Sequence, residues 1–324
     1  MKQRSAAVML VSAGLLTAFG WIGEIRAQTR TTRVGIMTIE EKQPWFEPFE
    51  RILAERGWAV GRSVVLDYRS AGGNASRFAD AALQLVRLKV DVLYAVGAPA
   101  VHAARAATRT VPIVGMDYST DPVAVGYADS YGHPGQNLTG VFLDAPDFTG
   151  KWLEILRIMV PRLSHIAVLW DPAPGAVHLR AVQSSAHTFR MQVQVLEVRT
   201  PDDIERAFSA LRPRPQALIV LPSPLLYSQS ARLAGLALKH RLPGTSMFRL
   251  FSDSGGMVTY GPDLTTSVER CAILVAKILS GANPADLPVE RPAKFELIVN
   301  SKTVKALGLT VPDSILLRAD EVIR

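Results

Sequence analysis

Polar and aromatic residues stand at the points where short apolar runs end and helical stretches begin. The residues at these junctions are Thr38, Gly97, Ala98, Pro99, Asp117, Ser119 and Asp121 in the first half of the chain, and Trp170, Asp171, Ser223, Pro224 and Phe248 in the second half. Free N–H groups at helix N-termini attract a carboxylate or another anion, and carboxylates can meet an ammonium group. Together the two kinds of group have the chemistry to bind a zwitterion.

Aromatic residues near these junctions extend the candidate site. Trp45, Tyr118, Trp170, Phe248 and Tyr260 can form apolar walls for a flat or aliphatic ligand. Trp45 and Tyr260 therefore join the twelve junction residues as predicted ligand contacts. Structural roles stay open: Ser119 and Ser223 also suit helix caps, and Trp45 also suits packing its helix against the core.

Catalytic and metal-binding patterns are absent from the sequence. It contains no Gly-x-Ser-x-Gly elbow, no Gly-x-x-x-x-Gly-Lys phosphate loop, and no Gly-x-Gly-x-x-Gly after the first apolar run. The six histidines are scattered without metal-ligand spacing, and the single cysteine, Cys271, lies in an apolar run. The carboxylates can pair for acid–base work, but no nucleophile accompanies them. We therefore expect a binding protein without cofactor or metal, and an exported α/β enzyme is the weaker alternative.

Two series of alternating strands and helices must position these junctions. The predicted strands are 33–39, 63–68, 91–95 and 111–115, and again 165–170, 192–198, 217–221 and 242–246. The predicted helices are 45–56, 75–88 and 98–108, and again 175–190, 201–212 and 224–240. The strands are nearly continuous apolar runs, which is typical of parallel sheets covered on both faces by helices.

This duplicated order predicts the fold class α/β, with two Rossmann-like lobes, each built on a parallel sheet. A segment at 137–143 crosses between the lobes, and further strands are expected at 256–260 and 294–300, on either side of a helix at 264–280. Because such sheets bind ligands outside the carboxyl ends of their strands, the junction residues of both lobes are expected to line one cleft.

The first residues have the layout of a secretory signal peptide. Lys2 and Arg4 precede an uncharged stretch, and Ala27 is a plausible end of the peptide. A membrane anchor is the alternative, but serine, threonine and glycine dilute the stretch. Cleavage after residue 27 removes three cations and one acid, so the formal charge falls from +7 to +5. Cations and acids are mixed along the mature chain, which disfavours nucleic acid as a partner.

The C-terminal region carries a family resemblance. Phe295–Asn300, Lys302-Thr303 and Lys305–Leu309 before Pro312 resemble the C-terminal signature of the ABC transporter substrate-binding family that includes tryptophan-binding proteins of the TrpX type. Similar blocks occur in the same order along nearly the whole mature chain, at 53–57, 96–99, 137–140, 256–263 and 285–289.

The resemblance implies a type I periplasmic-binding fold, in which a three-strand hinge joins the two lobes and the ligand is closed between them. It implies lobe 1 at 31–142 plus about 262–290, and lobe 2 at 143–261 plus about 291–324. It also implies a monomer in the periplasm that delivers a small molecule, such as an amino acid or related carboxylate, to an ABC permease and ATPase and meets the membrane only through that permease. A periplasmic ligand-sensing subunit for a receptor kinase shares the fold and stays an alternative.

Overall fold

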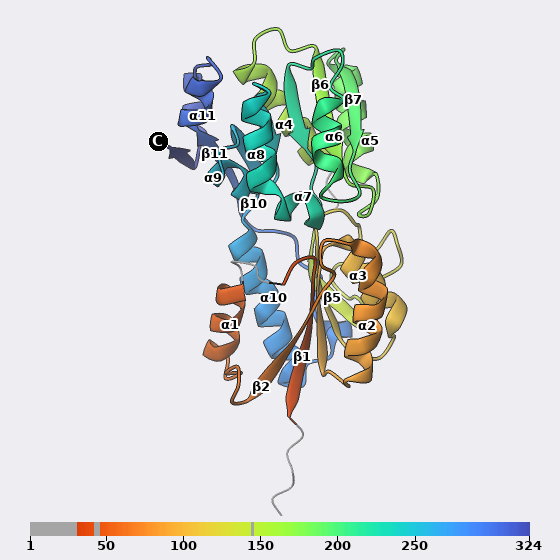
Figure 1. Cartoon of the computed structure of the whole chain (residues 1–324). Coiled ribbons are helices and arrows are strands. Elements are labelled where there is room, and N and C mark those ends of the chain that lie inside the picture. The colour runs from red at the N-terminus through yellow and green to blue at the C-terminus, as the bar shows by residue number, and fades with distance from the viewer. Residues whose placement is uncertain (1–30, 42–45, 144–145) are drawn as a thin grey trace, which may run out of the picture. The chain divides into compact units, whose positions relative to one another are not determined.

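The structure is a computed structural model that describes residues 31–41, 46–143 and 146–324. The predicted signal peptide and Trp45 lie outside the described residues. Two sheets organise residues 31–324, and each forms the centre of one lobe (Figure 1). This arrangement confirms the predicted fold class of two α/β lobes with parallel sheets.

Lobe 1 is built on a five-stranded parallel sheet with the order β2-β1-β3-β4-β5. Its strands are β1 (Thr32–Thr38), β2 (Val64–Ser70), β3 (Val92–Val96), β4 (Ile113–Asp117) and β5 (Leu138–Phe142). Helices α2 (Phe78–Arg87), which follows the short turn η1 (Ala75–Arg77), and α3 (Ala98–Ala107) cover one face, and α1 (Phe46–Glu55) and α10 (Leu264–Leu279) pack together on the other (Figure 1). The sheet is therefore buried on both sides, which explains its apolar strands.

Lobe 2 is built on a seven-stranded sheet with the order β12-β11-β10-β9-β8-β6-β7. Its strands are β6 (His165–Trp170), β7 (Gln192–Glu197), β8 (Ala217–Val220), β9 (Gly244–Ser246), β10 (Val258–Pro262), β11 (Phe295–Asn300) and β12 (Glu321–Ile323). Its helices are α4 (Pro146–Met159), α5 (Val177–Thr188), α6 (Asp203–Ser209), α7 (Pro224–Ser228), α8 (Ser230–Lys239), α9 (Leu250–Asp253), α11 (Ser301–Ala306) and α12 (Asp313–Leu316). Among the strand pairs of this sheet that the structure describes, only β10–β11 is antiparallel.

The chain passes between the lobes three times. The passages follow β5, separate β10 from α10 at Asp263, and separate the short turn η2 (Pro284–Asp286) from β11. Backbone hydrogen bonds tie them in pairs: the N–H of Phe142 donates to the carbonyl of Glu290 (2.9 Å), and the N–H of Asp263 donates to the carbonyl of Lys294 (2.9 Å). A helix from the C-terminal part of the chain, α10, is thereby returned to lobe 1.

Some predicted elements differ in extent from those observed. The helix predicted at 224–240 is broken into α7 and α8, because the hydroxyls of Ser228 and Ser230 donate to the carbonyls of Leu225 and Tyr227 at the break. Helix α4, which the sequence analysis did not predict, buries Trp152 completely in the core. No helix among the described residues is long and apolar enough to span a membrane.

Two glycines allow β4 and β5 to approach each other closely. Gly140 faces Gly115 across the strand pair, and it has a φ of +146°. A Cβ added at Gly140 would lie 1.9 Å from the carbonyl oxygen of Gly115, a backbone atom that cannot move aside. This contact fixes β5, and with it the first passage to lobe 2.

We expect Gly140→Ala to lower the free energy of unfolding by roughly 2–4 kcal/mol, because the strand pair must separate to admit a methyl group. Chemical denaturation of the purified variant measures this change. Gly132→Ala is the matched control, since a Cβ there meets nothing within 4 Å. Equal stability of both variants would contradict the close packing of β4 against β5.

Candidate ligand-binding site

A pocket lies between the carboxyl ends of the strands of the two lobes. Lobe 1 contributes Thr38, Ile39, Val96, Gly97, Ala98, Met116, Asp117, Tyr118, Ser119 and Leu264, and lobe 2 contributes Pro174, Pro222, Ser223, Pro224, Tyr227 and Phe248. The space between these residues, with its opening, measures about 620 Å³.

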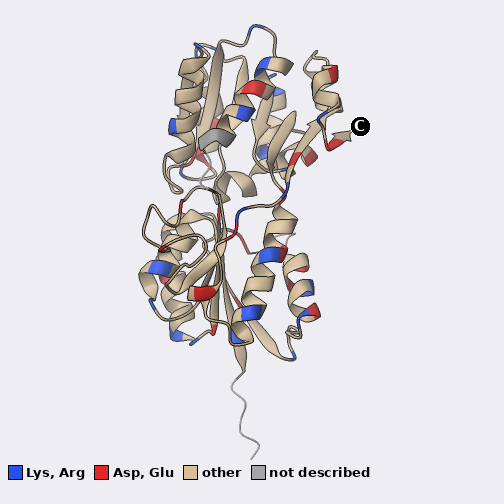
Figure 2. Cartoon of the chain, turned by 180° about the vertical axis from the view of Figure 1, so that it is seen from behind, with Lys and Arg blue, Asp and Glu red and all other residues tan. Residues whose placement is uncertain are grey.

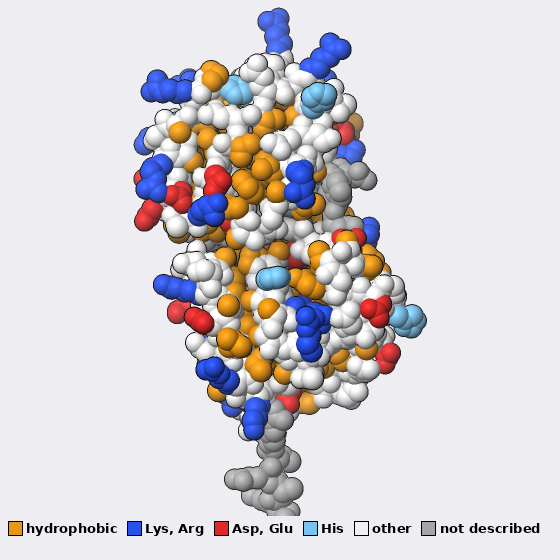
Figure 3. All heavy atoms as spheres, turned by 90° about the vertical axis from the view of Figure 1, so that its right-hand side faces the viewer, with side chains coloured by type: hydrophobic (Ala, Val, Ile, Leu, Met, Phe, Trp, Pro, Cys, Tyr) orange, Lys and Arg blue, Asp and Glu red, His pale blue; other side chains and the backbone are white. Residues whose placement is uncertain are grey.

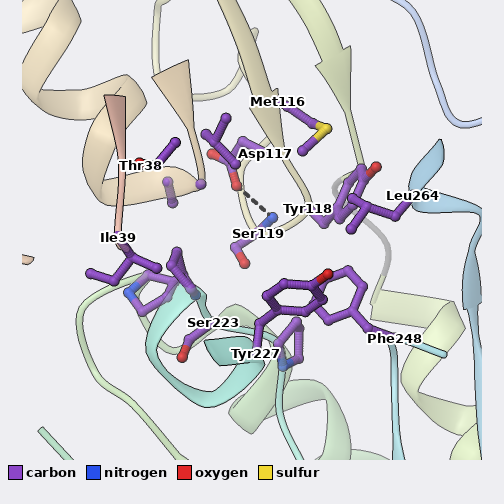
Figure 4. Close-up of a pocket in the computed structure, with 16 residues that line it drawn as sticks. Thr38, Ile39, Met116, Asp117, Tyr118, Ser119, Ser223, Tyr227, Phe248 and Leu264 are labelled. Atoms are coloured by element: carbon purple, nitrogen blue, oxygen red, sulfur yellow. Dashed lines mark hydrogen bonds between the residues drawn. The ribbon is translucent and has the colours of Figure 1, made fainter. Parts of the chain in front are cut away.

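The strands place the polar residues at one edge of each sheet. Thr38 ends β1 and Asp117 ends β4, while Gly97 follows β3 directly and opens α3. Figure 4 shows Asp117 and Ser119 of lobe 1 facing Tyr227 and Phe248 of lobe 2 across the pocket. The duplicated order of strands and helices thus brings the predicted junctions of both lobes to a single site.

Among the described residues that line the pocket, Asp117 alone has a side chain that is charged at neutral pH. Its side chain is buried, and Oδ1 accepts a hydrogen bond from the N–H of Ser119 (2.8 Å). Oδ2 has no hydrogen-bond partner among the described residues. Burial raises the pKa of the Asp117 carboxyl to about 6, although hydrogen bonds from Thr120 and Ser119 oppose this shift.

Aromatic rings form the apolar part of the wall. Phe248 packs edge-on against Tyr227, with 5.2 Å between ring centroids, and lies 6.0 Å from the ring of Tyr118. Burial raises the pKa of Tyr227 to about 12, so its phenol is neutral at physiological pH. The pocket therefore combines one unsatisfied carboxylate with a wall suited to an apolar or aromatic group.

The two lobes touch each other beside the pocket. His178 is on α5 of lobe 2, and its Nε2 lies 2.6 Å from the carbonyl oxygen of Tyr118 in lobe 1. A carbonyl only accepts, so Nε2 carries the proton, and buried Nδ1 has no partner among the described residues. Burial lowers the pKa of His178, which keeps the ring neutral. A Cβ at Gly97 would lie 2.5 Å from Cγ of Pro224, so glycine is what permits this approach.

Several predicted site residues lie outside this pocket lining. Pro99 and Asp171 line a neighbouring pocket, where Oδ1 of Asp171 accepts from the N–H of Ala173 (2.9 Å). Asp121 caps a turn by accepting from the N–H of Val123 (2.9 Å). Trp170 donates from Nε1 to the carbonyl of Gly175 (3.0 Å). For these residues a ligand contact stays a prediction.

Tyr260 also lies outside the lining, and its carbonyl accepts from Nε1 of Trp152 (2.8 Å). Ser223 does line the pocket, and its hydroxyl caps α7 by accepting from the N–H of Leu226 (3.0 Å). The structural role left open for Ser223 is thus observed, while its ligand contact stays a prediction.

Sequence reasoning missed several lining residues. Met116 and Val96 lie within strands, Leu264 opens α10, and Pro174 lies in the loop before α5. Tyr227 lies one helical turn after Ser223, and that spacing was the available signal, since residues three to four apart share a helix face. Among the described residues no group of three or more histidine, cysteine, aspartate or glutamate side chains is placed to hold a metal ion.

Comparison with known proteins identifies the family. A family model described as "ABC transporter substrate binding protein" matches residues 46–323. A curated relative named "Tyrosine-binding protein", from Clostridioides difficile, is 26% identical over 267 residues, which cover 81% of this chain and 75% of the relative.

Solved structures share the fold. An ABC domain from Streptococcus pneumoniae in complex with L-Trp has a TM-score of 0.80 at 21% identity and covers 90% of this chain and 100% of that one. A ligand-free, open substrate-binding protein from Clostridium difficile has a TM-score of 0.61 at 23% identity. The match covers 90% of this chain and 99% of that one. A leucine-binding protein from Thermotoga maritima has the same fold, with a TM-score of 0.57 at 14% identity. The match covers 79% of this chain and 84% of that one.

These comparisons confirm the type I periplasmic-binding fold and the resemblance noted in the sequence. The matched family consists of binding proteins, so the prediction of a binding protein rather than an enzyme is confirmed by the family match. The chain belongs to the ABC transporter substrate-binding protein family.

Proposed function

We propose that this protein captures an amino acid with an aromatic or large apolar side chain between its two lobes. The observation that carries the proposal is the unpartnered Oδ2 of buried Asp117 in the pocket wall. A buried carboxylate without a partner is costly, and the ammonium group of an amino acid supplies both the missing hydrogen bond and the opposite charge.

The other end of a zwitterion has a matching group. Helix α3 begins directly after Gly97, which lines the pocket, and no side chain caps this helix end. Pro99 at the second position has no N–H, so the N–H groups of Ala98 and Ala100, with the positive end of the helix dipole, are the ones that suit a carboxylate. The described residues that line the pocket include no lysine, arginine or histidine, so the helix end supplies the positive partial charge for an anion there.

The rings of Tyr118, Tyr227 and Phe248 suit the ligand's side chain. Names of relatives point the same way, since one is called a tyrosine-binding protein and another was solved with L-Trp. A thermal-shift screen of the twenty amino acids tests the choice, because a bound ligand raises the melting temperature by mass action. Absence of a shift with every aromatic and large aliphatic amino acid would refute it.

We further propose that the protein works in the periplasm after cleavage of its signal peptide, as a monomer that delivers its ligand to a membrane permease and ATPase. The family match supports this role. The alternative role in ligand sensing predicts unchanged uptake in a deletion strain, whereas delivery predicts that uptake of the amino acid is lost.

We expect Asp117→Asn to change both the stability of the protein and its ligand binding. The raised pKa of Asp117 means that folding stability is lost as pH rises through about 6, where the buried carboxyl ionises. Without ligand, the variant should be more stable than the wild type at pH 8 by about 1–2 kcal/mol, and the difference should shrink below pH 5. The melting shift caused by the amino acid should disappear. A variant that is destabilised at pH 8, or that binds normally, would contradict a ligand role for this carboxylate.

Ligand affinity should itself depend on pH. Because the ammonium group pairs with ionised Asp117, a ligand-free pKa of about 6 predicts that the dissociation constant rises about tenfold for each pH unit below 6. Calorimetric titration between pH 5 and 8 measures this slope. A dissociation constant that does not change across this range would show that Asp117 is not the ammonium partner.

The contact between His178 and Tyr118 should stabilise the closed arrangement of the lobes. His178→Ala removes this hydrogen bond and should weaken ligand binding by roughly tenfold. X-ray scattering should also give a larger radius of gyration for the ligand-free variant than for the ligand-free wild type. His187→Ala is the matched control, since His187 is an exposed histidine on the same helix. Equal affinities of the two variants would refute this role for His178.

A further inference from the structure

The end of lobe 2 that lies away from the pocket is strongly basic. In a parallel sheet all strands begin at the same end and finish at the other. The connections that precede β6, β7, β8 and β9 therefore gather at the amino ends of these strands, opposite the pocket. These connections and the last turn of α8 carry six cations, all of them exposed: Arg162, Arg190, Arg212, Arg214, Lys239 and Arg241. We call this set the basic end.

Acids are segregated to the other edge. Residues 155–252 contain five acids, which are Asp171, Glu197, Asp202, Asp203 and Glu205. Each lies at or just after the carboxyl end of β6 or β7, or at the start of α6. Figure 2 marks lysine and arginine positions in blue on the ribbon at the upper end of lobe 2, and Figure 3 shows such side chains projecting from that end. The separation of charge is therefore a consequence of strand direction.

The cations of the basic end form no ion pair with a described residue. Arg214 donates to the carbonyl of His240 (2.6 Å), which joins two of the connections. Between them runs a groove lined by Arg212, Arg214, Lys239 and Arg241, with Leu211 and Leu242 among its apolar residues. Unpaired, exposed cations leave the charge of this end available to an external partner.

The corresponding end of lobe 1 differs. Its connections and the helix ends beside them also carry cations, at positions 56, 62, 87, 89 and 109, but these are interspersed with Glu55, Asp91 and Asp129. Charges of both signs within a Debye length, about 8–10 Å at physiological salt, largely cancel toward a distant partner. The basic end of lobe 2 has no such compensation in its connections.

We propose that the basic end of lobe 2 docks on a membrane surface of anionic phospholipid headgroups. Its cations come from four separate connections across one end of the lobe and do not converge on a buried site, which suits an array of headgroups rather than a single anion. The contact would hold the protein at the membrane where the permease of the proposed function resides, in addition to any contact with the permease itself.

The test is flotation of the purified protein with vesicles. Phosphatidylcholine vesicles that contain phosphatidylglycerol should bind the wild type at low salt, pure phosphatidylcholine vesicles should not, and high salt should release the protein. The variant Arg162→Gln, Arg190→Gln, Arg212→Gln, Lys239→Gln removes one cation from each of the connections before β6, β7 and β8 and one from the last turn of α8. Its partition coefficient should fall about fivefold for each cation removed.

The matched control removes the same charge from lobe 1, in Arg56→Gln, Arg62→Gln, Arg87→Gln, Arg109→Gln. It should keep most of the binding, and the amino-acid thermal shift should be unchanged in both variants, so failure here is distinct from failure of the proposed function. Equal losses in the two variants would show an effect of net charge alone and overturn the proposal. Absence of vesicle binding would overturn it as well. The same holds if the protein binds a soluble polyanion or inorganic phosphate but no vesicles.

Discussion

A carboxylate held in the interior with one oxygen unsatisfied is the constraint around which the site is organised. Asp117 ends β4, and its Oδ1 accepts a hydrogen bond from the N–H of Ser119. Its Oδ2 has no hydrogen-bond partner among the described residues, and the residue lines the pocket. Such a group opposes folding at neutral pH, so packing elsewhere must offset its cost. Fully buried side chains such as Trp152, Phe142 and Phe49 supply that packing on both sides of the passages between the lobes.

Strand direction links the two ends of lobe 2. The carboxyl ends of β6, β8 and β9 bring Pro174, Ser223 and Phe248 to the pocket, and the opposite ends of the same strands carry the basic end. The common direction of these strands thus separates the residues that line the pocket from the basic end. The same separation allows each surface to be changed by mutation without direct contact with the other.

Local sequence signals were sufficient for the lobes and for much of the pocket. Continuous apolar strands and the residues after them located Thr38, Gly97, Asp117, Ser119 and Phe248 at the carboxyl edges. Tyr227 and Leu264 were beyond such reasoning, because their place in the wall depends on the break after α7 and on the return of α10 to lobe 1.

Side-chain hydrogen bonding was also not predictable from the junction pattern. Asp117 ends β4 and Asp121 comes four residues later, yet the first lines the pocket and the second caps a turn. Asp171 resembles Asp117 in sequence context, but it lines a neighbouring pocket. The difference arises from how each loop folds after its strand, which involves contacts between residues distant in the sequence.

The position of the ammonium group tests the central claim most directly. A crystal structure of the protein with the amino acid that gives the largest thermal shift should place the ligand's ammonium nitrogen about 2.7–3.2 Å from Oδ2 of Asp117. The ligand's side chain should then lie against Tyr227 and Phe248. A ligand whose ammonium group is turned away from Asp117, or which is bound elsewhere on the protein, would contradict the account.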